Sequence, residues 1–355
     1  MAKLWIFLAL PLISAFPTEF PPDPELELEF LGIAKRWDYE AEEHFVTTAD
    51  GYILTIHRIP NKQHQKGIPN CARPTVFLQH GMEGSSASWI LNLPSQSAGF
   101  TFADAGFDVW LGNFRGNVMG TMAAFAEFST NHQLEQKIRE FHALGPVASV
   151  AHIKGLFAWL ADRYQFVQEL LKDLGWDQFL PPDWLTRLIA EDVCEDADTY
   201  KDCDNLLFLI SGNSNQLNET RVPVYLNHMP SGTSTNVVIQ MAQNVKAQKF
   251  QMFDYDDEKE NQKHYGQPTP PKYAVEDMTL PTRLYWGFND TLADPLDIQS
   301  YLIPRLQSMR SQKGYDGFAH IDFEWGLKAH DQVFGPIIEY INEDWKNWKG
   351  QEFTC

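Results

Sequence analysis

The sequence predicts an α/β fold in which helices cover a mostly parallel sheet, and three observations support this prediction. Short apolar segments typical of strands alternate with helical stretches over residues 16–147. The alternation stops over residues 148–278, which read as a mainly helical insertion. It resumes in residues 279–355, which end in a closing helix. We therefore expect one sheet built from the two flanking parts, with the insertion between them.

Residues 1–15, before the first predicted element, have the layout of a secretory signal peptide. Lys3 supplies a positive charge, Leu4–Ile13 is an apolar run, and the small residues Ser14 and Ala15 follow. A membrane anchor is the alternative, but this run is about half of the roughly 20 residues that span a bilayer. No other segment is long and apolar enough, so we expect no transmembrane segment and a mature chain that begins near Phe16.

The predicted strands of the first part follow one another along the chain. Residues Tyr52–Ile59 alternate like a half-buried strand, and Thr75–Gln79 is a short apolar run before a His-Gly turn. Phe107–Gly112 repeats the pattern of a strand that ends in glycine. Thr121–Arg139 consists mostly of helix formers, and Phe141–Val147 is the next strand. Strand, helix and strand in sequence indicate a parallel sheet.

The remaining elements lie in and after the insertion. Amphipathic stretches such as Ile153–Leu174 predict its helices. Pro281–Gly287 is then a strand that ends in a glycine turn, and a short strand precedes His320. A helix over about Asp331–Trp348 closes the chain.

Composition and charge exclude several classes of function. With 28 basic and 47 acidic side chains, the surface repels phosphate, so we expect neither nucleic acid nor an anionic membrane as a partner. Asn218 and Asn289 each begin a glycosylation sequon, which is a weak signal.

Cysteine and histidine positions limit the covalent and metal chemistry. The four cysteines are Cys71, Cys194, Cys203 and Cys355. Three pairings are open, and Cys194 with Cys203 is the one we favour, because these two close a short loop. The histidines His132, His142 and His152 are ten residues apart, which fits no metal-binding spacing. We expect no metal.

Seven segments, spread over nearly the whole mature chain, carry a family resemblance. They are Trp37–Tyr39, Asp50–Leu54, Leu78–Met82, Trp89–Pro94, Ala103–Asn113, Trp286–Pro295 and His320–Phe323. These strings resemble the acid lipases, a family that includes gastric lipase and lysosomal acid lipase and hydrolyses acylglycerols and steryl esters. The resemblance implies an α/β-hydrolase core with a helical cap, a Ser, Asp, His triad in that order, and no cofactor. It also implies a secreted or lysosomal protein that meets lipid esters at a lipid–water interface.

The resemblance assigns the acid and the base of the triad. Asp290 matches the family acid and His320 the family base, and each follows a predicted core strand. There a carboxylate can hold an imidazole in the tautomer that accepts a proton. Asp290 could instead be a helix cap or turn residue, and Asp294 and Asp297 are rivals for its role.

The resemblance also assigns the oxyanion segment. His80-Gly81-Met82 matches it, and the main-chain N–H of Met82 is the candidate donor to a tetrahedral oxyanion. The side chain of His80 is then a structural group of the turn, tied to the backbone.

The nucleophile is where this chain departs from the family pattern. Residues 116–121 can be laid on the family string Gly-His-Ser-Gln-Gly-Thr, and Val118 then stands at the serine position. Yet Arg115-Gly116-Asn117 is itself a family string that normally follows the strand ending at Gly112. The chain therefore looks as if it has lost a helix, a strand and the serine turn before Thr121, through a skipped exon or a faulty gene model.

Such a loss has consequences for the chemistry and for the fold. Val118 has no nucleophilic atom, so we expect no acyl-enzyme and no activity. The lost strand is central in the family, so the sheet should either contain a gap or shift the strand at Phe107–Gly112 into it.

Other nucleophiles and other functions remain as alternatives. The candidate substitute hydroxyls lie outside any nucleophile elbow, and capping or turn roles suit them better: Ser85, Ser86, Ser88, Thr121 and Ser129. An active hydrolase of another class would need an acid or cysteine after Gly112, where the chain has Asn113, Phe114 and Arg115. A non-catalytic lipid-binding protein stays open.

Overall fold

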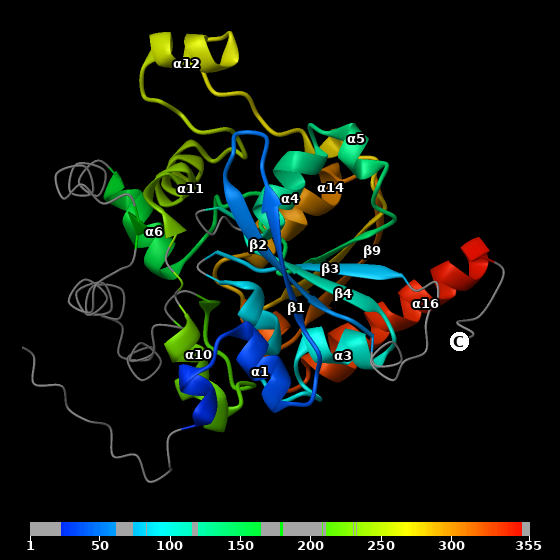
Figure 1. Ribbon diagram of the computed structural model, residues 1–355. Helices are drawn as coiled ribbons and strands as arrows, with labels where there is room; N and C mark the ends of the chain where they lie inside the picture. The colour runs from blue at the N-terminus through cyan, green and yellow to red at the C-terminus, as the bar shows by residue number, and fades with distance from the viewer. Residues whose placement is uncertain are drawn as a thin grey trace, which may run out of the picture.

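The computed structural model describes residues 23–61, 74–82, 84–115, 120–164, 178–179, 208, 211–229, 231 and 233–349 (Figure 1). The predicted signal peptide, all four cysteines and Val118 lie outside these ranges. No helix in the described ranges has the length and apolar character needed to cross a membrane.

Nine strands are described. They are β1 (Glu42–Thr47), β2 (Ile53–Ile59), β3 (Thr75–Gln79), β4 (Asp108–Gly112), β5 (Phe141–Leu144), β6 (Gln178–Phe179), β7 (Thr233–Ser234), β8 (Thr282–Gly287) and β9 (Met309–Tyr315).

Helices and helical turns lie between these strands. The described ones are η1 (Pro24–Glu27), α1 (Phe30–Arg36), η2 (Ser86–Ile90), α3 (Ala98–Asp104), α4 (Gly120–Phe128), α5 (His132–Glu135), α6 (Gly155–Asp162), η3 (Glu219–Arg221), α10 (Val222–His228), α11 (Thr235–Ala247), α12 (Glu258–Tyr265), η4 (Val275–Asp277), α13 (Pro295–Asp297), η5 (Ile298–Leu302), α14 (Ile303–Arg305), α15 (Asp322–Trp325), η6 (His330–Phe334) and α16 (Gly335–Lys349).

Most strands lie in two separate sheets. One has the order β1-β2-β4-β3, with β3 and β4 parallel, and the other has the order β5-β8-β9, with every pairing parallel. Within the described ranges no strand of the first sheet pairs with a strand of the second. The interruption follows β3 and precedes β5. Of the two arrangements expected from a lost strand, a gap or a shifted β4, the described strands have the gap, and the loss itself stays a prediction.

Side-chain packing holds the two sheets together. One buried cluster contains Val109 of β4, Tyr285 of β8 and Phe334 of η6, so it spans both sheets. A second cluster packs Phe125 of α4 and Leu284 of β8 beneath the insertion. Burial of apolar side chains therefore joins what the strand hydrogen bonds leave separate.

The insertion contains helices in its described part. α6 and α11 pack against each other, and α12 stands away from the sheets at the top of the view in Figure 1. The predicted helix over Thr121–Arg139 is instead two helices, α4 and α5. The break falls at Asn131, whose side chain caps α5 by accepting the N–H of Leu134.

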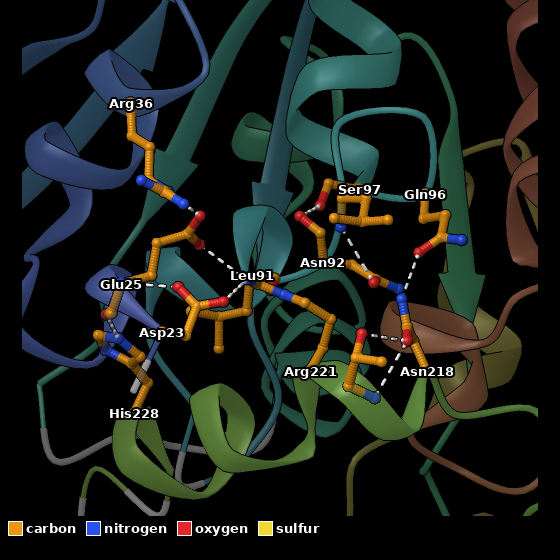
Figure 2. Close-up of polar contacts among 12 residues, drawn as sticks. Asp23, Glu25, Arg36, Leu91, Asn92, Gln96, Ser97, Asn218, Arg221 and His228 are labelled. Carbon is orange, nitrogen blue, oxygen red and sulfur yellow. Dashed lines mark hydrogen bonds and ion pairs between the residues drawn. The ribbon is translucent and has the colours of Figure 1, made fainter. Parts of the chain in front are cut away.

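A buried charge cluster fastens the end of the insertion to the start of the described chain. Arg221 of η3 forms ion pairs with Asp23 and Glu25 of the η1 turn, and its Nε donates to the carbonyl of Leu91 at 2.9 Å (Figure 2). Arg36 of α1 reaches the other oxygen of Glu25 at 3.0 Å. Arg221 and Glu25 are fully enclosed, so each charge depends on its partners.

Candidate functional site

The carboxyl ends of the second sheet bring the predicted triad residues together. β5, β8 and β9 are parallel, so the loops that follow them meet at one edge of the sheet. Gly145 follows β5, Asp290 follows β8, and His320 follows β9. In α/β folds this edge is where ligands bind.

Asp290 is a buried carboxylate with a full set of hydrogen bonds. Its Oδ1 accepts the backbone N–H groups of Leu292 at 2.9 Å and Ala293 at 2.7 Å. Its Oδ2 lies 2.9 Å from Nδ1 of His320. The turn after β8 therefore fixes one oxygen with backbone donors and presents the other to the imidazole.

His320 is held in one orientation and one tautomer by this contact. Nδ1 faces the carboxylate and acts as the donor, which leaves Nε2 as the basic nitrogen. Burial lowers the pKa of His320, but the charge and hydrogen bond of Asp290, together with the charge of Glu324, outweigh it, so the pKa is raised. A base of this kind takes a proton from a nucleophile or water.

Two glycines allow the loops to approach this closely. A Cβ on Gly145, whose φ is +54°, would lie 2.8 Å from Cε1 and Nδ1 of His320. A Cβ on Gly287 at the end of β8 would collide with the carbonyl of Phe318. The sequence pattern of strands that end in glycine therefore corresponds to a close approach of backbone and ring at this site.

His80 and Gly81 follow β3 and form the predicted oxyanion segment. His80 is buried, its Nδ1 lies 2.7 Å from the carbonyl of Gly81, and its Nε2 accepts the N–H of Phe114 at 3.3 Å. Burial lowers the pKa of His80 to about 4, so the ring is neutral with its proton on Nδ1. His80 is the structural turn residue that the sequence predicted. Met82 is half-buried beside it, and its main-chain role stays a prediction.

Residues on both sides of 116–119 are anchored by contacts with other segments. Arg115 pairs with Asp50 at 2.7 Å and covers the ring of Tyr52. Gly120 begins α4 so close to the carbonyl of His80 that a Cβ there would collide with it. Thr121 accepts the N–H of Val147 at 3.0 Å. The chain therefore enters α4 beside the oxyanion segment, where an elbow nucleophile belongs.

None of the substitute hydroxyls is hydrogen-bonded to His320 in the described ranges. Ser86 has a histidine of its own: its Oγ lies 2.8 Å from Nδ1 of His57, whose Nε2 lies 3.5 Å from Glu43. Ser86 is only 2% exposed, however, and its Oγ also accepts from Asn113. This set of contacts is structural.

The other candidates also make local bonds. Ser85 caps η2, and Ser88 completes that capping box. Ser129 donates to the carbonyl of Ala126 at 2.8 Å. None of these hydroxyls has a partner that could take its proton in catalysis.

Both rivals of Asp290 make structural contacts. Asp294 caps α13 through the N–H of Leu296 and pairs with Lys154 at 2.7 Å. Asp297 accepts from Ser149 at 2.9 Å and from the backbone of His152 at 2.8 Å. Only Asp290 contacts His320 among these three.

Glu324 is a site residue that sequence reasoning missed. It lies in α15, one helical turn after His320, with its carboxylate beside the backbone of Gly81 in the oxyanion segment. Its Oε1 would lie 3.9 Å from a Cβ on Gly81. Burial raises the pKa of Glu324 to about 7. The charge of His320 and the backbone of Gly81 lower this pKa, but by less than burial raises it. The four-residue spacing from His320 is the only signal the sequence offered.

The two sequons differ in surroundings. The side chain of Asn218 donates to Gln96 at 3.3 Å and accepts from Thr220 at 2.8 Å (Figure 2). Asn289 is exposed, directly before Asp290. The amide nitrogen of Asn218 that would carry a glycan already donates to Gln96, whereas no hydrogen bond of the Asn289 side chain is described. Both modifications stay predictions.

Comparison with known proteins places the chain. Residues 31–93 match the sequence model of a partial alpha/beta-hydrolase lipase region. Lipase lipl-1 of Caenorhabditis elegans is 37% identical over 96% of this chain and 98% of that protein. Human gastric triacylglycerol lipase is 34% identical over 97% and 100%, and human lysosomal acid lipase/cholesteryl ester hydrolase is 35% identical over 90% and 92%. A solved monoglyceride lipase variant of Saccharomyces cerevisiae gives a TM-score of 0.48 at 12% identity, over 85% of this chain and 94% of that one.

The length of these alignments adds a further fact. The alignment with the nematode lipase runs over 401 positions, more than the 355 residues of this chain, so it contains positions at which this chain has no residue. Identity above 30% over nearly full length in several lipases settles the relationship. The chain belongs to the acid lipase family and has the α/β-hydrolase fold.

Proposed function

We propose that this chain is an acid lipase variant that keeps the acid, the base and the oxyanion segment but lacks the nucleophile, and that it does not hydrolyse lipid esters. The interruption of the sheet between β3 and β5 is the observation that carries the proposal. In an α/β-hydrolase the serine elbow follows a central strand. In sequence the break lies between β4 and β5, the stretch that contains Val118, the residue that can be laid on the serine position.

Physical chemistry gives the consequence for catalysis. His320 has a basic Nε2, but Val118 offers it no O–H, so no acyl-enzyme forms. Without the nucleophile, the oxyanion segment and substrate binding supply only the residual rate that triad-deleted hydrolases retain, about 10³ to 10⁴-fold over water.

The relatives support an activity for a complete form of this chain. A full-length form of this chain, with a strand and a serine elbow restored, hydrolyses acylglycerols or steryl esters in the secretory or lysosomal lumen. Its triad is the restored serine with Asp290 and His320, and the N–H of Met82 contributes to the oxyanion hole. Residues 148–278 then form the cap, between core parts 16–147 and 279–355.

The test compares two proteins made in the same secretory host. One is this chain, and the other carries the strand, helix and serine block of a relative between Asn113 and Thr121. We expect fatty acid release from an acylglycerol emulsion and labelling by a fluorophosphonate only in the second. The control replaces its restored serine by alanine. Serine-dependent esterase activity in the unaltered chain contradicts the proposal, and transcripts across Asn113–Thr121 establish which form the tissue makes.

A non-catalytic lipid-binding function is the second candidate. It draws on the intact contact between Asp290 and His320 and on the buried cluster that spans both sheets, which are features of a folded site. A monodisperse chain that binds a fatty ester without turnover supports this function. Aggregation or rapid proteolysis of the purified chain counts against it.

A further inference from the structure

The carboxylate of Glu324 lies beside the oxyanion segment, where its negative charge would repel a bound anion. Glu324 lies one helical turn after His320, and its Oε1 would lie 3.9 Å from a Cβ on Gly81, the residue before Met82. A carboxylate here adds a negative charge beside the segment where an anion would bind. Like charges a few ångströms apart in a partly buried site repel each other, because the protein screens them less than water does.

We propose that Glu324 is a proton-controlled gate on the oxyanion segment, which closes the segment to anions as a carboxylate and opens it as a carboxylic acid. The proposal rests on the proposed roles of His320 and of the oxyanion segment, and it assigns their regulation. The ligand class is an oxyanion on an alkyl chain, such as a fatty acid carboxylate or the tetrahedral intermediate of ester hydrolysis.

The other charged groups near Glu324 set the direction of the switch. His320 faces it from the loop after β9, and Asp290 lies behind His320. Within α15, Asp322 accepts hydrogen bonds from Ser214 at 2.5 Å and from the N–H of Ala319 at 2.7 Å. The positive charge of Lys328, which follows α15, lowers the pKa of Asp322.

The oxyanion segment contributes no charge of its own. His80 stays neutral because burial lowers its pKa to about 4. At pH 5.5 Glu324 is neutral and His320 is a cation, so an anion is attracted. At pH 8 Glu324 is charged, so an anion is repelled.

Anion binding to the chain as it exists tests the gate, because binding needs no nucleophile. The probe is 1-octanesulfonate, whose charge is constant between pH 5.5 and 8, and calorimetry gives its dissociation constant. We expect Glu324→Gln to bind the sulfonate about fivefold or more tightly than the wild-type chain at pH 8, and within twofold of it at pH 5.5. A purely structural role of Glu324 changes binding at both pH values.

The matched control is Asp331→Asn, which removes one acidic charge from an exposed side chain outside the site. It should change sulfonate binding at neither pH. A Glu324→Gln effect of equal size at both pH values, or none at pH 8, overturns the gate. No sulfonate binding at pH 5.5 overturns the anion site itself. Ester hydrolysis by the unaltered chain would instead overturn the proposed function, so the two failures are distinct.

The wild-type chain supplies a second measurement that needs no variant. In ¹³C-histidine-labelled protein, the ring signal of His320 should move in two steps with pH, one from its own proton and one from the proton of Glu324. A single step means that Glu324 does not titrate beside His320, and this outcome overturns the proposal even where Glu324→Gln fails to fold.

Discussion

Single residues of the site set the protonation of the base. Asp290 supplies both the charge and the hydrogen bond that raise the pKa of His320 against the effect of burial. Asp290→Asn should therefore lower the pKa of His320 below its ordinary value, because burial then dominates. NMR titration of the His320 ring measures the change. Asp316→Asn is the control, since Asp316 is exposed in the same loop. An unchanged His320 titration in Asp290→Asn would show that the carboxylate is not the controlling group.

Substitutions at Gly145 and Gly317 distinguish the cost of backbone strain from the cost of contact with His320. Its φ of +54° disfavours any side chain, and a Cβ would press on the His320 ring at 2.8 Å. Gly317 has a φ of +73° but nothing within 4 Å of an added Cβ. Gly317→Ala should cost about 1 kcal/mol of unfolding free energy, and Gly145→Ala about 2 to 3 kcal/mol together with a displaced His320 signal. Equal losses of unfolding free energy for Gly145→Ala and Gly317→Ala in urea denaturation would mean that the His320 ring moves aside without cost.

At the scale of elements, the sequence pattern predicted six strands of the two main sheets and missed β1. The six are β2, β3, β4, β5, β8 and β9. Phe141–Val147 was predicted to be longer than β5, which ends at Leu144 because Gly145 turns the chain. Glu324 and the charge cluster of Arg221 were not predictable. Their partners lie far along the chain, at Gly81, Asp23 and Glu25, and single-sequence patterns carry no information on such contacts.

The charge cluster around Arg221 joins η1 to η3. Arg221→Met leaves the carboxylate of Glu25 enclosed without its main partner, so we expect a loss of about 3 to 5 kcal/mol in unfolding free energy. Arg36 is the other partner of the Glu25 carboxylate, and its side chain is 38% exposed. Arg36→Met should therefore lower the free energy of unfolding by about 1 kcal/mol or less. Urea denaturation of both variants measures the difference. Similar losses would contradict the assignment of Arg221 as the main partner.

Among the described strands, β3 lies at an edge of its sheet, and we expect this edge to promote association of the chain. Phe77 of β3 is 57% exposed, and strands at open edges promote association. Phe77→Lys should lower concentration-dependent light scattering of the purified chain. Phe288→Lys is the matched control, because Phe288 is 48% exposed but lies in a loop after β8. If both substitutions reduce scattering equally, general apolar exposure is the cause and the edge of β3 is not.

The whole molecule is two sheets held by a common core, and its stability depends on protons bound at the site. The pKa values of His320 and Glu324 are both raised in the folded protein, that of Glu324 to about 7. The folded state then holds protons that the unfolded chain releases, so the stability these groups confer is present at low pH and is lost as pH rises. Two buried groups act in the opposite direction. The pKa values of His57 and His80 are lowered, and their effect appears only as pH falls below about 6.5.

Between pH 6 and pH 8 the site groups therefore dominate. We expect the free energy of unfolding to fall by about 1 to 2 kcal/mol over this interval, as Glu324 and His320 lose their protons. Glu324→Gln removes one of the two groups, so the stability of this variant should fall less between pH 6 and pH 8 than that of the wild-type chain. Urea denaturation at each half pH unit measures both curves. A wild-type curve that rises from pH 6 to pH 8 would mean that the acidic surface and the buried histidines outweigh the site, and that Glu324 is ionised throughout. Because this measurement needs neither ligand nor nucleophile, it tests the protonation of the site in the chain as it stands.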